Sequence, residues 1–519
     1  MEEYSYLYLG LALLSLLVVV LAGRRRTAKH GVQGLRPPPS PWALPVIGHL
    51  HHLVGALPHH AMRGLSRRHG SVMLLRLGEV PTLVITSREA ASEVMKTHDT
   101  VFASRRLRPT TSVLTNGGRE IIFAPYGEYW RQLRKIAVTE LLTARRIRSF
   151  RWIREEEVAA TLHDVAEAAV KARPMEMRAR LSTLVAETMV RAVMGVRCKD
   201  IDVFLTSLER AVELAGGFNL ADLWPSSRLA CALTSAGKEA KECRDAVFGI
   251  LDGIIQKHLE RTGDGHTEDL LDVLLKIQKE GDLKFPLDMD DIKSFVFGLF
   301  AAGSESVFTT LEWVFAELTK NPRVMQRTTA EVRQAFEASG TAVEGRLGEL
   351  PYMHLVIRET LRLHPAVPLL IPRESREMCQ VLGYDVPQGT QVLVNVWAMG
   401  RDERYWDAPE EFRPERFECE AARDFKGLDF ELLPFGAGRR MCPGMNFGVA
   451  VLELALASLL LHFDWEWEEP GLSDPTQLDM TETFGLTARR KANLLLRPVL
   501  RVPVPVPVPG MPCPGAELP

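Results

Sequence analysis

The sequence is poor in cysteine and has no large excess of charge of either sign. Its seven cysteines are scattered and include no Cys-x-x-Cys pair, which argues against a disulfide framework and a thiolate zinc site. The net charge is −3 and the basic residues are dispersed, so no nucleic-acid partner is expected. Regular alternation of strand and helix patterns is also missing, which excludes a fold of βαβ units. Hydrophobic residues at 46% and charged residues at 25% are typical of a globular protein.

The N-terminal segment departs from this globular composition. Residues 4–23 form an uncharged stretch that is followed by Arg24, Arg25 and Arg26. The stretch is long enough to cross a bilayer as a helix, and the positive-inside rule places the arginines on the cytosolic side. A cleaved signal peptide would have a basic region before the apolar stretch, and this chain has none. We therefore predict a transmembrane signal-anchor with residues 1–3 in the lumen.

Proline-rich segments flank the remaining chain. Residues 24–49 are basic and then proline-rich, which predicts a stiff hinge between the anchor and the globular body. Residues 502–519 begin by alternating valine with proline, a pattern that excludes helix and central strand and predicts a flexible tail. Residues 50–501 form the predicted globular domain.

Helical patterns dominate this domain, so we predict a mainly α fold with a minor β-sheet region. The predicted helices cover residues 128–142, 151–171, 235–261, 290–320, 322–338 and 350–363. Alternation around Gly78-Glu79 predicts a hairpin over 71–87, and further strands are expected within 382–397.

One cysteine differs from the others in its surroundings. Cys442 lies in the glycine-rich stretch PFGAGRRMCPG, which opens into an apolar helix. Helix-start N–H groups and the nearby Arg439 and Arg440 favour a thiolate. A lone thiolate presented in this way suits an axial haem ligand better than zinc, which requires four ligands. A buried free cysteine is the alternative. The haem interpretation is favoured by a fuller pattern, F-x-x-G-x-R-x-C-x-G, completed by Phe435, Gly438, Arg440 and Gly444.

The stretch AAGSES places a carboxylate in an otherwise apolar helical run. Glu305 lies there between Ser304 and Ser306. Burying a charge costs several kcal/mol unless the charge is paired, solvated or neutralised. The position therefore calls for a polar environment or a function.

Three further motifs are weak when taken alone. Trp130 and Arg134 are one helical turn apart, Glu359 and Arg362 share a helix face, and Arg416 lies in FRPERF. An amphipathic helix with one buried tryptophan, or a solvated ion pair, would explain them equally well.

The order of these motifs resembles the cytochromes P-450, which are haem-thiolate monooxygenases, along the chain from the anchor to Gly485. The phrases FAPYGEYWRQLRK, PRES and FGAGRRMCPG make it most similar to plant microsomal members of specialised metabolism. The resemblance implies the cytochrome P-450 fold, a haem-thiolate catalytic domain over 50–501, and haem b with Cys442 as the axial iron ligand.

The resemblance also implies roles for the other motif residues. The haem-binding residues would be Trp130, Arg134, Arg373, Phe435, Gly438, Arg440 and Gly444. A buried ion network that supports folding and haem retention would consist of Glu359, Arg362 and Arg416.

The family delivers protons to oxygen through an acid–alcohol pair, which would here be Glu305 and Ser306. Threonine is usual where this chain has Ser306, and serine lacks the methyl group that fixes the hydroxyl rotamer. We hypothesise that oxygen activation survives with looser coupling. The alternative is that Ser306 only bonds to the helix backbone.

The residues that match family substrate-recognition segments are mostly apolar, which predicts a small hydrophobic substrate. The pocket candidates are Phe300, Ala302, Val367, Leu370 and Phe484, with the loop 105–122 contributing a further wall. A terpenoid is the preferred substrate class, and an indole, a phenylpropanoid or an alkaloid is the alternative.

The resemblance implies a single-pass enzyme of the endoplasmic reticulum membrane with its catalytic domain in the cytosol. Electrons would come from NADPH through NADPH-cytochrome P-450 reductase, with cytochrome b5 as an optional second partner. A reductase-independent haem-thiolate isomerase or lyase is the first alternative, although such relatives usually lack the acid–alcohol pair. A non-enzymatic haem protein is the second.

Overall fold

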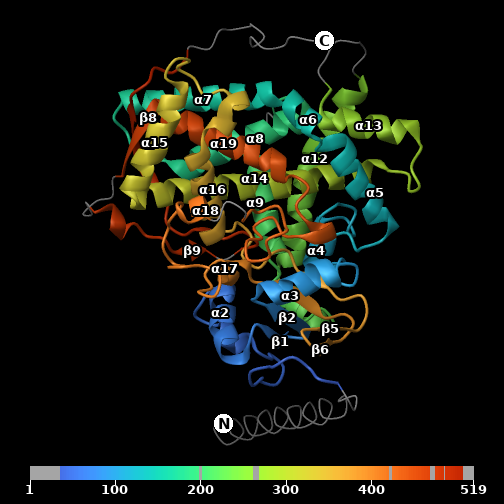
Figure 1. The fold of residues 1–519 in the computed structure, drawn as a ribbon. Coiled ribbons are helices and arrows are strands. Elements are labelled where there is room, and N and C mark those ends of the chain that lie inside the picture. Colours follow the sequence, from blue (N-terminus) through green and yellow to red (C-terminus); the bar gives the residue numbers. More distant parts are fainter. Residues whose placement is uncertain are drawn as a thin grey trace, which may run out of the picture.

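The computed structural model describes residues 35–197, 201–260, 268–419, 423–467, 474–483 and 485–505. The predicted anchor, the luminal residues, the first part of the hinge, most of the tail and Phe484 lie outside these ranges. Within them a large helical body stands above a smaller region that contains a sheet (Figure 1), which confirms the predicted mainly α fold.

The central helix is α14 (Met289–Lys320), the longest described helix. It begins at a capping box, in which Asp288 Oδ1 accepts from the Asp291 N–H at 2.7 Å and Asp291 Oδ2 accepts from the Asp288 N–H at 2.9 Å. It ends at Asn321, because Pro322 starts the next helix. Most of its side chains are buried, so it forms the core against which the other helices pack.

The helices that pack most extensively on α14 are α8 (Met177–Met194), α9 (Ile201–Ala215), α16 (Pro351–Leu363) and α19 (Met445–His462). At Gly303 the two helices come close, and an added Cβ would lie 2.7 Å from the flexible end of the Met189 side chain of α8. Both α14 and α19 are long and apolar enough to span a membrane, yet 78% and 67% of their apolar windows are buried inside the protein. They are core helices of the described body.

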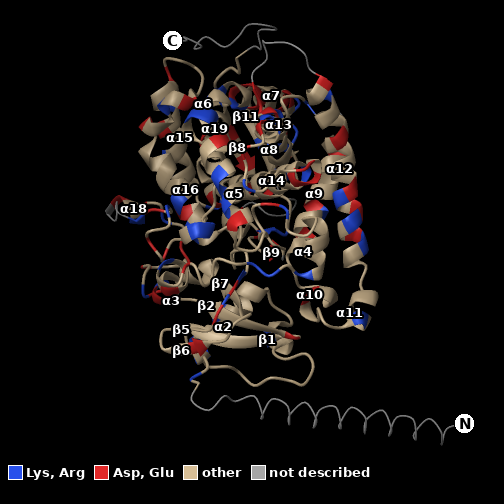
Figure 2. Cartoon of the chain, turned by 90° about the vertical axis from the view of Figure 1, so that its right-hand side faces the viewer, with Lys and Arg blue, Asp and Glu red and all other residues tan. Residues whose placement is uncertain are grey.

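The other long helices form the outer layer. They are α2 (Pro58–His69), α5 (Glu128–Ile136), α7 (Arg151–Val170), α12 (Ala236–Glu260), α13 (Leu270–Glu280) and α15 (Pro322–Phe336). Acidic and basic side chains alternate along α12 at the edge of the molecule (Figure 2), as expected for a solvated helix. The short α-helices are α3 (Arg88–Ser92), α4 (Pro109–Leu114), α6 (Ala144–Ser149), α10 (Leu220–Leu223), α11 (Arg228–Ala232), α17 (Val396–Met399) and α18 (Arg416–Cys419).

Single turns of other helix types complete the helical inventory. The 3₁₀ turns are η1 (Leu50–Leu53), η4 (Glu344–Glu349), η5 (Gly438–Arg440) and η6 (Pro475–Gln477). The π turns are η2 (Glu93–Thr97) and η3 (Ala137–Leu141). The predicted helix over 128–142 therefore consists of α5 followed by a π turn, whereas the other five predicted helices agree with the structure to within two residues.

The largest sheet has the order β1-β2-β7-β4. Strands β1 (Val72–Leu77) and β2 (Val80–Ile85) form the predicted hairpin around Gly78-Glu79, with Val72 opposite Ile85. Strand β2 then pairs in parallel with β7 (Gln391–Val394), and β7 pairs in the antiparallel sense with β4 (Arg373–Glu374). The strands expected within 382–397 end at Val394, because α17 follows.

Three smaller sheets lie elsewhere in the described chain. One has the order β3 (Met175–Glu176), β11 (Leu495–Leu500) and β8 (Phe463–Trp467). The other two are hairpins, β5 (Cys379–Val381) with β6 (Tyr384–Val386), and β9 (Glu482–Thr483) with β10 (Arg489–Arg490).

Candidate active site

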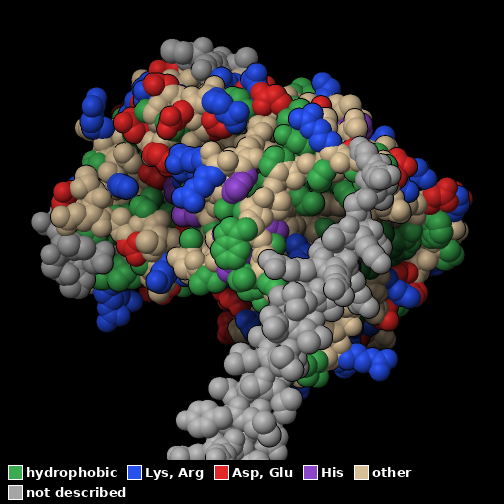
Figure 3. All heavy atoms as spheres, turned by 90° about the horizontal axis from the view of Figure 1, so that it is seen from below, with side chains coloured by type: hydrophobic (Ala, Val, Ile, Leu, Met, Phe, Trp, Pro, Cys, Tyr) green, Lys and Arg blue, Asp and Glu red, His purple; other side chains and the backbone are tan. Residues whose placement is uncertain are grey.

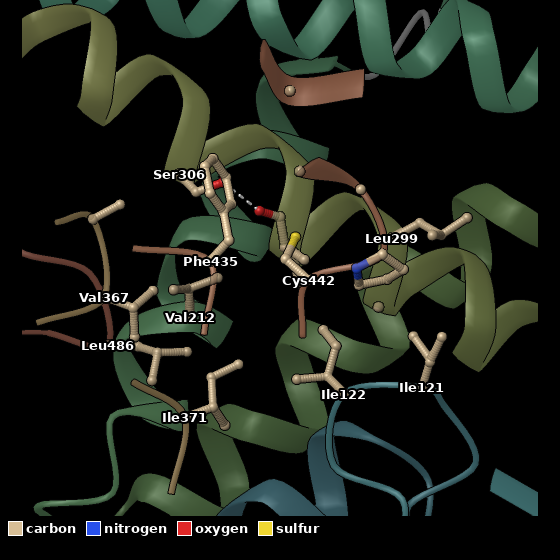
Figure 4. Close-up of a pocket in the computed structure, with 18 of the residues that line it drawn as sticks. Ile121, Ile122, Val212, Leu299, Ser306, Val367, Ile371, Phe435, Cys442 and Leu486 are labelled. Carbon is tan, nitrogen blue, oxygen red and sulfur yellow. Dashed lines mark hydrogen bonds between the residues drawn. The ribbon is translucent and has the colours of Figure 1, made fainter. Parts of the chain in front are cut away.

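A largely apolar cavity lies beside the middle of α14 (Figure 4). One wall is α14 itself, and the opposite side comes from the cysteine loop and the start of α19. The predicted loop 105–122 and the segments 366–373 and 486–487 close the remaining sides. Distant parts of the chain therefore meet at one internal space.

Cys442 faces this cavity, and Figure 4 shows its sulfur directed into the space. The side chain is accessible even though protein surrounds it, because the cavity itself exposes it. Burial raises the pKa of its thiol, whereas the backbone N–H groups of Gly444 and Met445 and the charge of Arg134 act in the opposite direction. The thiol thus has donors aimed at Sγ at the start of α19.

The loop that carries Cys442 depends on glycine at one defined point. Gly438 has φ +67°, and a Cβ there would lie 2.3 Å from the Met95 carbonyl oxygen. The Cys442 N–H donates to the Phe435 carbonyl at 3.0 Å and closes the loop. Gly444 is different, since its φ is −90° and no described atom lies within 4 Å of where a Cβ would stand. The backbone conformation at position 444 therefore does not require glycine.

Basic side chains gather at one end of the cavity. The lining residues of this kind are Arg105, Arg134, Arg373 and Arg440. Burial lowers the pKa of all four, to about 10 for Arg373 and about 9 for Arg440, and each of Arg373 and Arg134 lowers the pKa of Arg440 further. Four close guanidinium groups repel one another, so this end has a strongly positive potential.

Neutralising carboxylates are scarce there among the described residues. Asp99 Oδ1 is 3.7 Å from Arg373 Nη1. Glu120 lines the cavity, but burial raises its pKa to about 7 against the effect of the Ile122 and Phe123 N–H groups. Buried nitrogens of Arg105 (Nε and Nη1) and of Arg373 (Nη1) have no hydrogen-bond partner within the described chain. Such groups are costly unless an anion binds them.

Trp130 and Arg440 stack at this end, with the guanidinium carbon 4.1 Å from the ring centroid. The Trp130 Nε1–H donates to the Ile121 carbonyl at 2.9 Å, and Arg440 Nε donates to the Ala103 carbonyl at 2.6 Å. Arg440 Nη1 also donates to the Ile121 carbonyl at 3.3 Å, so both predicted residues are tied to the loop 105–122. Sequence reasoning missed Arg105 and Glu120, whose only signal was a charge within that loop.

Ser306 lies on the α14 wall of the cavity (Figure 4). Its Oγ donates to the Ala302 carbonyl at 2.8 Å, one helical turn earlier. The hydroxyl oxygen retains lone pairs that accept a hydrogen bond from the cavity side. The backbone bond proposed as an alternative therefore exists, and it leaves the hydroxyl available as an acceptor.

Glu305 points away from the cavity lining and is 6% exposed. Its Oε1 accepts from the Thr487 hydroxyl and lies 3.4 Å from Arg489 Nε. Burial raises the pKa of Glu305, while Arg489 and Thr487 lower it. The carboxylate in the apolar run is thus paired, by residues from the β9–β10 hairpin that sequence reasoning did not identify.

The predicted substrate residues divide into two groups. Ala302, Val367 and Leu370 line the cavity, and Leu370 has φ +49°, which is uncommon for a residue other than glycine. Phe300 does not line it, because its ring is fully buried against Phe204 at 4.9 Å between centroids. Phe484 lies outside the described residues.

The structure brings the three residues of the predicted ion network together. Arg362 Nε and Nη2 donate to the two oxygens of Glu359 at 2.7 and 2.8 Å, and Arg416 Nε donates to Glu359 Oε1 at 2.9 Å. Their side chains are at most 4% exposed. The remaining guanidinium N–H groups donate to backbone carbonyls of residues 400–411. The network therefore fastens that long loop to α16.

Comparisons with known proteins agree with this arrangement. The family model for cytochrome P-450 matches residues 37–494. The chain is 47% identical over 473 residues to dolabradiene monooxygenase from Zea mays, covering 90% of this chain and 93% of the relative. It is 44% identical over 505 residues to desmethyl-deoxy-podophyllotoxin synthase from Sinopodophyllum hexandrum, covering 96% and 98%.

Among solved structures, a zebrafish cytochrome P-450 with abiraterone superposes with a TM-score of 0.73 at 26% identity. The match covers 86% of this chain and 99% of that one. Sequence, fold and the cavity with its cysteine lead to one conclusion. The chain belongs to the cytochrome P-450 family and is a monooxygenase of the plant type.

Proposed function

We propose that this protein uses dioxygen and NADPH, through a membrane-bound reductase, to hydroxylate a small hydrophobic molecule of plant specialised metabolism. The observation that carries the proposal is one cavity in which the Cys442 thiol, the Ser306 hydroxyl and a cluster of arginines meet an otherwise apolar lining. The enzyme would be anchored in the endoplasmic reticulum by residues 4–23.

Three observations support a haem in this cavity. Its two carboxylates would pair with the arginine cluster, whose buried nitrogens on Arg105 and Arg373 have no partner among the described residues. The iron would bind Cys442 Sγ, on which the Gly444 and Met445 N–H groups converge. The open space beside Gly444 in the cavity lining would admit the porphyrin face. Trp130, Arg134 and Arg440 would complete the haem-carboxylate site, with Phe435 and Gly438 shaping the cysteine loop.

Bound haem supplies the activation of dioxygen, and a thiolate ligand favours cleavage of the O–O bond. The residues of this chain do the rest. Burial raises the pKa of the Cys442 thiol, so the thiolate would form when iron binds, and the N–H donors and Arg134 would then stabilise its negative charge. The apolar side chains around the cavity exclude water and hold a hydrocarbon substrate near the reacting centre.

Protons would reach the cavity through two hydroxyls. Ser306 Oγ would accept a proton from water in the cavity and donate its own proton toward the reacting oxygen. When no proton is being transferred, the hydroxyl donates to the Ala302 carbonyl. Glu305 does not line the cavity itself. It is connected to the cavity through Thr487, which lines it and whose hydroxyl donates to Glu305 Oε1. The raised pKa of Glu305 makes it a proton reservoir nearer neutral pH than an ordinary carboxylate.

A terpenoid hydrocarbon is the proposed substrate class. Much of the lining near Cys442 is aliphatic, with Val212, Val367, Ile371 and Leu486 around the space in Figure 4 beside the ring of Phe435. Dolabradiene monooxygenase, the 47% identical relative, acts by its name on a diene. A second candidate is a precursor of the product that the 44% identical relative is named for, desmethyl-deoxy-podophyllotoxin.

Dependence on a reductase separates the proposal from a reductase-independent isomerase or lyase. Microsomes that contain this chain and a plant NADPH-cytochrome P-450 reductase should convert a terpenoid hydrocarbon to an alcohol carrying one atom of ¹⁸O from ¹⁸O₂. The product should be absent without NADPH or without the reductase. Conversion of a peroxide substrate at equal rates with and without the reductase would contradict the proposal.

Replacing Ser306 with alanine should uncouple oxygen use from product formation. A positioned proton donor contributes about 10²–10⁴-fold to a rate, so product formation should fall by about 100-fold or more while peroxide release per NADPH rises. The measurement is product, peroxide and NADPH in the same reaction. Ser306→Thr is the matched control and should couple at least as well as the wild type, since threonine keeps the hydroxyl and adds the methyl group. Unchanged coupling in Ser306→Ala would leave Ser306 with its backbone bond only.

A further inference from the structure

A second cavity lies apart from Cys442, where α2 meets the β9–β10 hairpin, the end of α16 and α17. Two consecutive histidines of the first turn of α2, His59 and His60, both contact the Glu482 carboxylate of β9 there. Seen from below, histidine side chains gather near the middle of the lower face (Figure 3), the end of the molecule where α2 lies in Figure 1.

The three side chains direct their ligand atoms at one point. His59 Nε2 is 2.7 Å and His60 Nε2 is 3.3 Å from the same oxygen, Glu482 Oε2, and all ligand atoms lie within 4.8 Å of one another. Bonds of about 2.0–2.2 Å in a tetrahedral zinc site place neighbouring ligand atoms roughly 3.3 Å apart. A metal ion would therefore require His59 Nε2 to move outward from Glu482 Oε2, and ligand atoms that lie up to 4.8 Å apart to close to this spacing.

A third imidazole, from His364, borders the same cavity. Its side chain is 6% exposed, and its Nδ1 has no hydrogen-bond partner among the described residues and lies 4.0 Å from Glu482 Oε1. The other ring nitrogen, Nε2, is bonded to Glu317 Oε1 at 2.7 Å, and the ring stacks on Trp313 at 3.9 Å. A metal-ligating histidine is usually oriented by such a carboxylate on its second nitrogen. His364 is thus held with a free nitrogen facing Glu482.

The charge around the cavity does not oppose a cation. Besides Glu482, the carboxylates of Glu317, Glu410 and Asp479 line it, together with Lys320, Arg401 and Lys491. Four carboxylates therefore face three cationic side chains. The His60 ring stacks on Trp397 with 4.1 Å between the ring centroids. His60 has the most exposed side chain of the three candidate ligands, at 42%, and this stacking already orients it.

We propose that His59, His60 and Glu482 bind a divalent transition-metal ion of the zinc type, with His364 Nδ1 or water as the fourth ligand. Two imidazoles and one carboxylate suit zinc, whereas magnesium and calcium prefer oxygen ligands. Binding requires the Nδ1–H tautomer of His59 and His60, so that each Nε2 lone pair faces the ion in place of the present contact with Glu482.

Such a site has a structural consequence for the active cavity. Glu482 begins the β9–β10 hairpin, whose turn contributes Leu486 and Thr487 to the cavity that contains Cys442. The ion would fasten this hairpin to α2. It would thereby stiffen one wall of the proposed substrate site without touching the haem or the substrate.

The test uses the full-length holoenzyme in detergent, dialysed against Zn²⁺ alone and, separately, Mg²⁺ alone, with bound metal measured by elemental analysis. Wild type should bind Zn²⁺ and not Mg²⁺. His60→Ala and Glu482→Gln should each weaken Zn²⁺ binding by at least about tenfold. Zn²⁺ should also slow amide exchange over 480–491 in the wild type and not in His60→Ala. The reduced-carbonyl spectrum checks the fold of each variant, and His60→Asn replaces any that fails it.

The chain supplies its own control in His51 and His52. These adjacent histidines also pack against a tryptophan, Trp42, but their recorded hydrogen bonds go to the backbone carbonyls of Gly48 and Trp42. The double variant His51→Ala/His52→Ala should bind Zn²⁺ as the wild type does. Zinc binding that is absent in the wild type, or that is equal in wild type, His60→Ala and Glu482→Gln, would overturn the proposal.

Discussion

Replacing Cys442 with serine is expected to abolish the red-shifted Soret band of the reduced carbonyl complex and to reduce product formation to background. A serine hydroxyl does not ionise at neutral pH, so the N–H groups of Gly444 and Met445 would face a neutral oxygen instead of a thiolate. Without thiolate donation to the iron, cleavage of the O–O bond is no longer favoured. The measurement is the reduced-carbonyl difference spectrum of purified protein, followed by turnover with the reductase.

Cys379→Ser is the matched control for this experiment. Cys379 is a half-buried free cysteine in β5 and does not line the cavity. This variant should retain the spectrum and the activity of the wild type. A normal red-shifted band in Cys442→Ser would mean that another side chain ligates the iron, and it would refute the proposed role of Cys442.

Replacing Glu359 with glutamine should produce the largest loss of stability among single conservative substitutions in the described body. The change leaves Arg362 and Arg416, both almost fully buried, without their shared counter-charge. Removing one partner of a buried ion pair costs about 3–5 kcal/mol, because the remaining charge stays uncompensated. Chemical denaturation followed by tryptophan fluorescence and by the Soret band would show a lower midpoint and earlier loss of haem.

The comparison variant is Glu418→Gln. Glu418 pairs with Arg327 at 2.7 Å, but both side chains are more than 40% exposed. An exposed pair of this kind contributes about 0–1 kcal/mol, so its midpoint should remain close to that of the wild type. Equal midpoints for Glu359→Gln and Glu418→Gln would contradict a stabilising role for the buried network.

The elements of the fold that depend on local pattern could be predicted from the sequence. The bounds of α7, α12, α14, α15 and α16 follow from apolar periodicity, capping residues and prolines, and these act within a few residues. The pairing of β2 with β7 in parallel could not be predicted, because nothing in either strand specifies a partner about 300 residues away.

The same division applies to the active site. The motif around Cys442 and the pair Glu359–Arg362 are compact in sequence, so their spacing was informative. The partners of Glu305 are not close to it in sequence, since Thr487 and Arg489 come from a hairpin more than 180 residues later. Phe300 shows what a helical pattern cannot predict. Whether an apolar residue of α14 faces the core or the cavity depends on how the helix is rotated about its axis, and the sequence does not specify that rotation.

The parallel pairing of β2 with β7 also determines which strand edge stays unpaired while the chain is being synthesised. The β1–β2 hairpin is synthesised about 300 residues before β7, which corresponds to about 15–60 s at ~5–20 residues per second. During that interval the free edge of β2 presents unpaired N–H and C=O groups next to valine, leucine and isoleucine side chains that are buried in the finished protein. Such an edge is a template for association with other chains. The nascent chain therefore depends on shielding of this hairpin, by a chaperone or by its own early helices, until the C-terminal half supplies the missing strand.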